Sequence, residues 1–270
     1  MRNKLISHES PLSLLKDSLS YNDYDYILVH LLEQEPEYLD FFESSTLRMG
    51  RKSLMDTSIF ELGSAFDTDK YATWVDRINP TEYILPDVLE DYEGTIESSR
   101  KFQQKFGKLL KGKQIGVVQG KSFEEIKSCY RVLDRELNVD KIAISFDYSY
   151  YRTLFPHPNK WVSFMMGRVM LIGMLFEDGL AFNRNKPHHL LGCSNPLEFK
   201  FYKHSDFDFI ESIDTSSPVV HGLYSKRYSE EIGSWNKVSV KLADLIKACP
   251  SEEEKSIIME NIALFRSYVN

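Results

Sequence analysis

Carboxylate and amide side chains end four short apolar runs in this sequence, and together they could act on a glycosidic bond. The four residues are Asp56, Asp87, Gln119 and Asp214. Retaining substitution at a sugar needs two carboxylates, because one attacks the anomeric carbon while the other handles the proton of the departing group. An amide and a further carboxylate suit the edge of a guanine-like base, whose N1 and N2 donate and whose O6 accepts hydrogen bonds. These residues indicate a glycosidase or glycosyltransferase acting on an N-glycosidic bond.

Asp214 is the residue around which the other elements are arranged. The small polar residues and proline of 215–218 cannot continue a central strand. Asp214 is therefore predicted at the carboxyl end of a strand, where a barrel enzyme carries its chemistry. Each residue also has a structural alternative: Asp214 could cap the following turn, Asp56 and Asp87 could cap turns or helices, and Gln119 could be a structural amide.

Seven apolar, β-rich runs predict strands. They are Tyr24–His30, Lys52–Asp56, Tyr83–Asp87, Gln114–Gln119, Lys141–Phe146, His188–Gly192 and Phe207–Asp214. Helical patterns separate them, which predicts βαβ units and a parallel sheet. Seven units with room for an eighth predict an α/β fold of the (β/α)8 TIM-barrel type rather than an open sheet. The eighth strand is expected near Val219–Leu223.

Helices and chain ends complete the predicted fold. Residues 1–22 are expected to be an N-terminal lead-in, and residues 225–270 a C-terminal helical segment. The predicted helical pieces are Leu12–Leu19, Tyr92–Leu110, Lys160–Glu177, Val238–Cys249 and Lys255–Tyr268. A capping box at Ser251 and Glu254 precedes the last of these, and a second box at Ser122 and Glu125 predicts the start of another helix. A short helix is also predicted to start at Pro196. With no repeat or linker, residues 1–270 are expected to form a single TIM-barrel domain without a zinc subdomain.

Length and composition limit the class of protein. The 270 residues suit one α/β barrel of roughly 250 residues. No apolar run approaches the roughly 20 residues that span a bilayer, and the N-terminus has no apolar signal core, so a cytoplasmic protein is expected. Cys129, Cys193 and Cys249 lie too far apart to predict a disulfide framework or a zinc site. No metal or cofactor is expected.

Four short blocks share their order and spacing with a known family. They read L-M-D-T-S-I-F at 54–60 beside the family's T-D-S-G-G-[FY], G-V-V-Q-G at 116–120 beside G-[IV]-V-Q-G, H-L-L-G at 189–192 beside Y-L-M-G, and I-D-T-S-S-P at 213–218 beside F-D-C-V-L-P. The chain thus resembles the tRNA-guanine transglycosylase superfamily, especially the short phage and bacterial members that place 7-deazaguanines in DNA. The blocks cover the core from about Ser53 to Pro218.

The resemblance implies a role for each matching residue. Asp214 would attack C1′ of the target nucleoside and expel guanine, leaving a covalent glycosyl-enzyme. Asp56 would protonate guanine and then deprotonate the incoming 7-deazaguanine. The remaining residues would bind the base: Asp87 and Gln119 at its edge, backbone groups around Ser145 and Phe146 at its carbonyl, and Phe60, Leu191 and Gly192 around its plane. Phe60 and Leu191 could instead be core residues.

Where this sequence departs from the family's motifs, the differences favour DNA over tRNA as the substrate. The zinc motif C-x-C-x2-C with a later His is missing, since the C-terminal part holds only Cys249 and His221. The tRNA enzymes use the zinc subdomain to shape the surface that meets RNA, so its loss favours another nucleic acid. Ser145 and Phe146 replace paired glycines, and only Asp147 could stand for the glutamate associated with an aminomethyl-bearing base. The nitrile-bearing base preQ0 is therefore the expected 7-deazaguanine.

A DNA substrate would have to extrude its guanosine from the stack, which costs a few kcal/mol. The net charge of −7 argues against sequence-blind binding over the whole surface but leaves room for a local basic patch. Candidates for phosphate contacts are Arg51, Lys52, Arg100, Lys101, Lys105 and Arg184. The alternative for the basic run Arg100–Lys113 is a solvated helix face.

Other functions fit the same residues. They are base exchange in tRNA, a hydrolytic N-glycosidase, and a non-catalytic nucleic-acid-binding partner subunit on the same fold. Asp56 and Asp214 are both present, which favours an enzyme over the partner subunit. The sequence is compatible with a homodimer or with a helper protein that opens the duplex, and the host cytoplasm is the expected location if the chain is phage-encoded.

Overall fold

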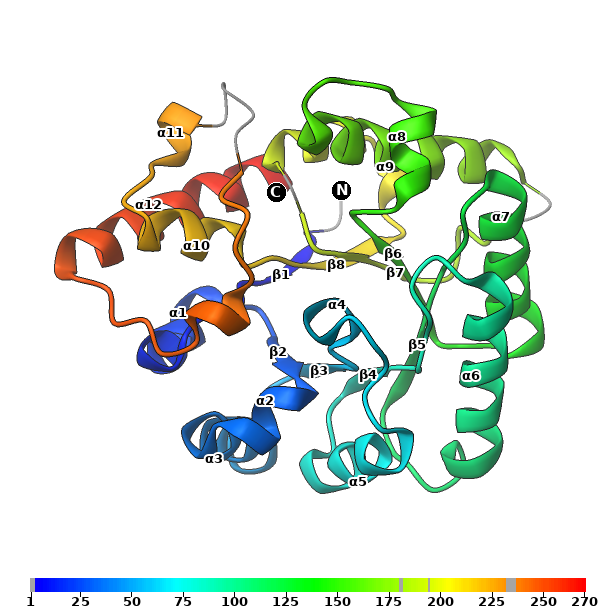
Figure 1. The fold of residues 1–270 in the computed structure, drawn as a ribbon, viewed down its shortest axis with the longest axis horizontal. Helices are drawn as coiled ribbons and strands as arrows, with labels where there is room; N and C mark the ends of the chain where they lie inside the picture. The colour runs from blue at the N-terminus through cyan, green and yellow to red at the C-terminus, as the bar shows by residue number, and fades with distance from the viewer. Residues whose placement is uncertain (1–2, 180–181, 194, 232–236) are drawn as a thin grey trace. The chain divides into compact units, whose positions relative to one another are not determined.

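Eight parallel strands form one sheet, which makes a nearly closed barrel with helices around it. This computed structural model describes residues 3–179, 182–193, 195–231 and 237–270. The strand order in the sheet is β1-β8-β7-β6-β5-β4-β3-β2 (Figure 1). The strands are β1 (Leu5–Ser7), β2 (Asp25–Leu28), β3 (Ser53–Asp56), β4 (Glu82–Ile84), β5 (Lys113–Val117), β6 (Lys141–Ser145), β7 (His188–Leu191) and β8 (Ile210–Asp214). The expected (β/α)8 TIM-barrel class is confirmed.

Helices follow most strands along the chain. The α-helices are α1 (Leu15–Tyr21), α2 (Val29–Gln34), α3 (Pro36–Glu43), α4 (Ile59–Leu62), α5 (Thr68–Ile78), α6 (Tyr92–Phe106), α7 (Phe123–Arg131), α8 (Ser149–Leu154), α9 (Lys160–Glu177), α10 (Ser217–Leu223), α11 (Tyr228–Glu231) and α12 (Glu252–Val269). Short 3-10 or π-helical turns are η1 (Leu12–Leu14), η2 (Ser44–Arg48), η3 (Val132–Glu136), η4 (Pro196–Tyr202), η5 (Ser205–Phe207) and η7 (Leu242–Leu245). In the described part of the chain, every helix falls short of the length and apolarity that crossing a bilayer requires.

Contacts within the chain define two compact units. Unit 1 comprises Met1–Asp23, Phe146–Met174 and His189–Asn270, and unit 2 comprises Tyr24–Ser145 and Leu175–His188. In unit 2, β2 to β6 pair in chain order and in parallel register. Their central residues, such as Ile27, Met55 and Ile142, are fully buried. Parallel strands covered on both faces are typically apolar in this way.

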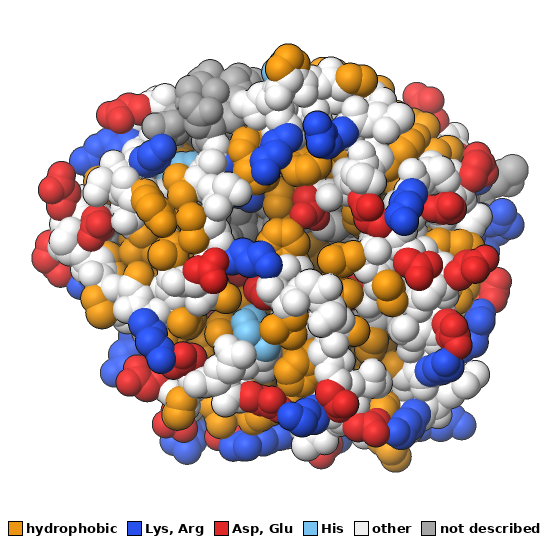
Figure 2. Space-filling model, viewed as in Figure 1, with side chains coloured by type: hydrophobic (Ala, Val, Ile, Leu, Met, Phe, Trp, Pro, Cys, Tyr) orange, Lys and Arg blue, Asp and Glu red, His pale blue; other side chains and the backbone are white. Residues whose placement is uncertain are grey.

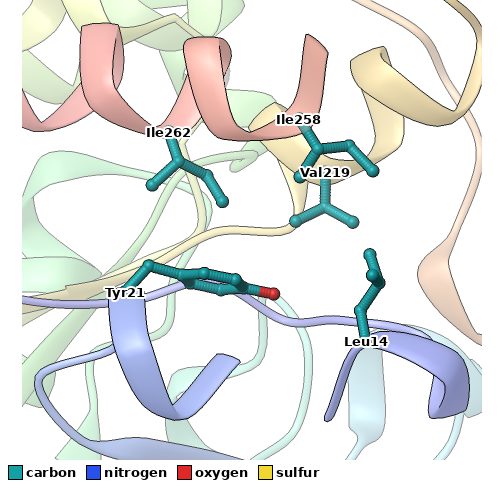
Figure 3. Packing of buried hydrophobic residues seen from close by; sticks show 5 residues of the cluster. All are labelled: Leu14, Tyr21, Val219, Ile258 and Ile262. Atoms are coloured by element: carbon teal, nitrogen blue, oxygen red, sulfur yellow. The ribbon is translucent and has the colours of Figure 1, made fainter. Parts of the chain in front are cut away.

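In unit 1, β1 pairs with β8, and Ser7 lies opposite Asp214. Helix α10 packs along α12 (Figure 1), and their apolar side chains meet those of η1 and α1 in a buried cluster (Figure 3). The cluster comprises Leu14, Tyr21, Val219, Ile258 and Ile262. Gly222 permits the close approach of the two helices, because a Cβ there would lie 2.3 Å from Ile258 Cγ1. The packing secures the segment that directly follows Asp214.

Three sequence predictions of secondary structure are wrong. Val219–Leu223 is helical and belongs to α10, because Pro218 in the first turn is well suited to start a helix. The eighth strand is instead β1, within the expected lead-in 1–22, where three residues are too few to give an alternation pattern. Val238–Cys249 contains only the turn η7, since its opening V-S-V has low helix propensity. Residues 232–236 of the expected C-terminal helical segment lie outside the described residues.

Candidate functional site

Asp214 is the centre of a buried hydrogen-bonded group in unit 1, here called the Asp214 cluster and made of Asp214, His189, Ser212 and Gly192. Asp214 is the last residue of β8, and both of its carboxylate oxygens accept from the backbone N–H of Gly192, each at 3.2 Å. His189 Nε2 lies 2.9 Å from Asp214 Oδ1, and His189 Nδ1 lies 2.9 Å from Ser212 Oγ. The cluster therefore holds the Asp214 carboxylate from two directions.

The hydrogen bonds of the cluster are consistent with one arrangement of protons. An ionised carboxylate only accepts hydrogen bonds, so His189 Nε2 carries the proton towards Asp214. In that tautomer Nδ1 accepts from the hydroxyl of Ser212. The result is a carboxylate whose direction is fixed by a ring N–H and a backbone N–H, which suits attack on an electrophilic carbon or stabilisation of a nearby positive charge.

Ser212, His189 and Asp214 have the residue types of a serine-hydrolase triad, but burial argues against that chemistry. In such a triad the serine hydroxyl must reach the substrate. Ser212 is only 2% exposed and His189 is fully buried, while Asp214 is 4% exposed. Asp214 is nearly as buried, but it ends β8, whereas Ser212 lies two residues inside the strand, so the carboxylate is the one of these two groups at the strand's carboxyl end.

A second group of polar side chains lies in unit 2 and is here called the Asp87 cluster, made of Asp87, Gln119, Thr57 and Asp56. Gln119 Nε2 donates to Asp87 Oδ2 at 2.8 Å, and Gln119 Oε1 accepts from the backbone N–H of Glu90 at 2.8 Å. The backbone donor fixes which end of the Gln119 amide faces Asp87. The other oxygen, Asp87 Oδ1, and the hydroxyl of Thr57 are buried and have no hydrogen-bond partner among the described residues. A ligand that donates a hydrogen bond would supply the partner that Asp87 Oδ1 lacks.

Burial raises the pKa of the Asp87 carboxyl from 3.8 to about 7. The hydrogen bond from Gln119 opposes this change, and the charge of Asp56 adds to it. Asp56 is the last residue of β3 and is half-buried; its carboxylate accepts from the hydroxyl of Tyr26 and, at 2.5 Å, from the backbone N–H of Ser58. Unit 2 thus holds two interacting carboxyls, and the pKa of the Asp87 carboxyl lies near neutral pH.

The other predicted base-binding residues lie at strand ends or on the surface of their units. Ser145 ends β6 and is half-buried, and Leu191 ends β7. Phe146 lies in unit 1, and its ring is so close to Gly192 that a Cβ on Gly192 would lie 2.5 Å from it. Lys237 Nζ lies over the same ring, 4.2 Å from its centre. Phe60 lies on α4 and is 42% exposed. A ring exposed to this extent is not a core residue.

The predicted phosphate-contacting residues are mostly engaged with acidic partners. Figure 2 shows basic and acidic side chains interspersed over the face in view. On α6, three basic side chains pair with exposed acids: Arg100 with Glu136, Lys101 with Glu97, and Lys105 with Asp69. Such exposed pairs are each worth at most about 1 kcal/mol, so a phosphate could compete for the cation.

The other three predicted phosphate-contacting residues differ in the side chains that they contact. Arg51 Nε lies 3.1 Å from the buried Asp25 carboxylate, which makes Arg51 a structural partner rather than an open phosphate site. Arg184 lies over the ring of Phe176, at 3.8 Å from its centre. Lys52 is exposed.

No protein-family model matches this chain, and no curated protein matches its sequence. The structure brings Asp214 together with Gly192, and Asp87 together with Gln119 and close to Asp56.

Two members of the Asp214 cluster, His189 and Ser212, are absent from the residues predicted from sequence. A signal for both was present, because residues two apart in a strand project on the same face. Ser212 precedes Asp214 by two residues in β8, and His189 precedes Leu191 by two in β7. Thr57 was marked only by its place directly after Asp56.

Proposed function

We propose that this chain is a base-exchanging transglycosylase that replaces guanine in DNA with a 7-deazaguanine such as preQ0. The observation that carries the proposal is the Asp214 carboxylate at the end of a barrel strand, with both oxygens bound by the Gly192 N–H and one also facing His189. The order of the short sequence blocks, which resembles the tRNA-guanine transglycosylase superfamily, supports the choice of base exchange.

In the first step an oxygen of Asp214 attacks C1′ of the target nucleoside. The C1′–N9 bond breaks, its electron pair goes to the departing guanine, and Asp56 donates a proton to that guanine. In the second step Asp56 takes the N9 proton of the incoming 7-deazaguanine, whose N9 attacks C1′ and releases the Asp214 carboxylate. Bonds and protons balance over the two steps, and no cofactor is consumed.

Asp87 and Gln119 are proposed to bind the edge of the base. Asp87 Oδ1 has no partner within the described residues and is available to accept from base N–H groups when Asp87 is ionised. Ser145, Phe146, Phe60, Leu191 and Gly192 are proposed to surround the base, and the exposed basic residues to contact DNA phosphates. We further propose that the reaction occurs in the cytoplasm, and that the chain acts as a homodimer or with a helper protein that opens the duplex.

The test is incubation of the protein with duplex DNA and preQ0, followed by mass spectrometry of the released nucleosides. Wild type is expected to yield the deazaguanosine, and Asp214→Asn none, because an amide is a poor nucleophile towards C1′. Asp206→Asn is the matched control, since Asp206 is an exposed acid of the same unit. Equal product from wild type and Asp214→Asn would remove Asp214 from the chemistry.

Further arms of the assay identify the reaction and the polymer. Exchange of radiolabelled guanine into DNA identifies a transferase, whereas abasic sites without exchange identify a hydrolase. Replacing DNA with tRNA in the same assay decides between the two nucleic acids. Exchange into tRNA alone would contradict the DNA proposal and leave the catalytic proposal intact.

A further inference from the structure

One peptide group, between Leu191 and Gly192, is bound at both of its ends in unit 1. Its N–H end is the Gly192 donor to Asp214, at 3.2 Å from each carboxylate oxygen. Its C=O end accepts from Arg168 Nη1 at 3.0 Å. The next carbonyl, that of Gly192, accepts from Arg168 Nη2 at 2.9 Å. The guanidinium, the peptide and the carboxylate thus follow one another in a line of hydrogen bonds.

Arg168 is held rigidly enough to orient this peptide. It is fully buried in α9, and its fork pairs with both oxygens of Glu198, with Nε–Oε1 at 2.7 Å and Nη2–Oε2 at 2.8 Å. Glu198 also accepts from the hydroxyl of Tyr202 at 2.9 Å. A planar guanidinium with two bonds to one carboxylate has a fixed orientation, so its remaining N–H groups point in set directions.

Position 192 has a backbone conformation and a close neighbour that only glycine fits without strain. Its φ of +63° lies in the left-handed region, which favours glycine. A Cβ at this position would lie 2.5 Å from the ring of Phe146. Neither the positive φ nor the nearby Phe146 ring sets the direction of the Gly192 N–H by itself, because the peptide plane could still rotate about its flanking bonds. The hydrogen bond from Arg168 Nη1 holds the carbonyl end of that peptide.

We propose that Arg168 is a positioning residue for the reaction, which fixes the Leu191–Gly192 peptide so that its N–H is aimed at the two carboxylate oxygens of Asp214. A trans peptide is planar and its C=O and N–H point in opposite directions, so anchoring the oxygen aims the hydrogen. The guanidinium also polarises the peptide, which strengthens the bond to Asp214. This role rests on the proposed function, in which Asp214 is the nucleophile.

The variant that tests the role is Arg168→Met/Glu198→Gln, which removes both charges of the buried pair together. Removing Arg168 alone would leave Glu198 buried and unpaired, which is strongly destabilising, whereas replacing both charges avoids that penalty. The glutamine side chain still offers a carbonyl oxygen to the hydroxyl of Tyr202. The matched control is Lys141→Met/Glu82→Gln, which removes a second buried pair, 2.6 Å long, in unit 2.

The expected effect on base exchange is a fall in kcat with little change in KM. Misplacing a catalytic group by about 1 Å can cost up to about a hundredfold in rate, so we expect kcat to fall about tenfold to a hundredfold in Arg168→Met/Glu198→Gln. Arg168→Lys, which keeps the charge but cannot serve both carbonyls and Glu198, is expected to recover part of that loss. The Lys141→Met/Glu82→Gln control is expected to keep the wild-type kcat.

A second measurement observes the peptide itself and does not depend on activity. The sequence contains the step Leu–Gly only twice, at Leu62–Gly63 and Leu191–Gly192. Protein labelled with carbonyl-13C leucine and 15N glycine therefore gives two signals in a carbonyl-selected amide spectrum. In Arg168→Met/Glu198→Gln the Gly192 amide proton is expected to move upfield as its bond to Asp214 weakens, and the Gly63 signal to stay in place.

The outcomes separate this proposal from the proposed function. A moved Gly192 signal together with a reduced kcat supports the positioning role. An unmoved Gly192 signal overturns it whatever happens to kcat, as does a kcat within twofold of the control double variant. If wild type exchanges no base, the proposed function fails, and the Gly192 signal still decides whether Arg168 orients the peptide.

Discussion

Replacing Asp87 with asparagine is expected to stabilise the protein at high pH. Burial raises the pKa of Asp87 from 3.8 to about 7, so between these values the folded state keeps a proton that the unfolded state has lost. Stability therefore falls as pH rises over this range and stays low above it. At about 1.4 kcal/mol for each tenfold change in proton affinity, an ionised Asp87 lowers the free energy of unfolding by about 4 kcal/mol at pH 8.

Asparagine removes that charge and keeps the local hydrogen bonds. Its carbonyl can accept from Gln119, and its NH2 stands beside the hydroxyl of Thr57, where Asp87 Oδ1 has no partner among the described residues. At pH 5 the wild-type carboxyl is still protonated when folded, so the advantage of asparagine shrinks. We expect the gain in the free energy of unfolding from Asp87→Asn to be about 3 kcal/mol larger at pH 8 than at pH 5.

The measurement is urea unfolding of wild type and Asp87→Asn at pH 5 and pH 8, followed by tryptophan fluorescence. Asp91→Asn is the control, because Asp91 caps α6 by accepting from Gly94 N–H in a solvent-exposed position, and asparagine caps equally well. Its effect on stability is expected to be small at both pH values. If Asp87→Asn changes stability equally at pH 5 and pH 8, the raised pKa and the buried character of the carboxyl are both refuted.

Other predictions follow from single contacts. Burial lowers the pKa of His8 from 6.5 to about 3, so the unfolded state binds a proton that the folded state does not, and the free energy of unfolding decreases as pH falls below 6.5. His8→Leu should make the decrease between pH 7 and pH 4 smaller by about 3 kcal/mol, as measured by acid titration. Gly192→Ala should lower the free energy of unfolding by about 1–3 kcal/mol more than Gly63→Ala does. Both glycines have a positive φ, but only at position 192 would the new Cβ clash with the ring of Phe146. Equal losses in the two variants would exclude that clash. Ser251→Ala should lower the melting temperature through loss of the α12 capping box, worth about 1 kcal/mol, and an unchanged value would count against the cap.

The repeating pattern of strands and helices was enough to predict the barrel. Apolar runs that end in polar residues located the carboxyl ends of β3, β4, β5 and β8 to within a few residues. The long helix Lys160–Glu177 was predicted with the bounds it has in α9. Strand β1 was missed because three residues carry no periodicity, and its strand conformation depends on β8, which lies far along the chain.

The candidate site was predictable only in part. Asp214, Asp87 and Gln119 were predicted from their places at strand ends, and the structure shows hydrogen bonds from Gln119 to Asp87 and from Gly192 to Asp214. His189 was not among the predicted site residues, because a histidine within an apolar strand is indistinguishable from a core residue until its neighbours are known. Arg168 interrupts an apolar helix, and only the tertiary structure identifies Glu198 as its partner.

The pairing of β1 with β8 has a consequence for the synthesis of the protein on the ribosome. Leu5 pairs with Ser212, which is 207 residues later in the chain. At about 5–20 residues per second, a ribosome needs about 10–40 s to add that many residues. The strand Leu5–Ser7 must wait that long without its neighbour, and an unpaired strand invites adhesion between nascent chains. Its length of three residues keeps this hazard small during translation.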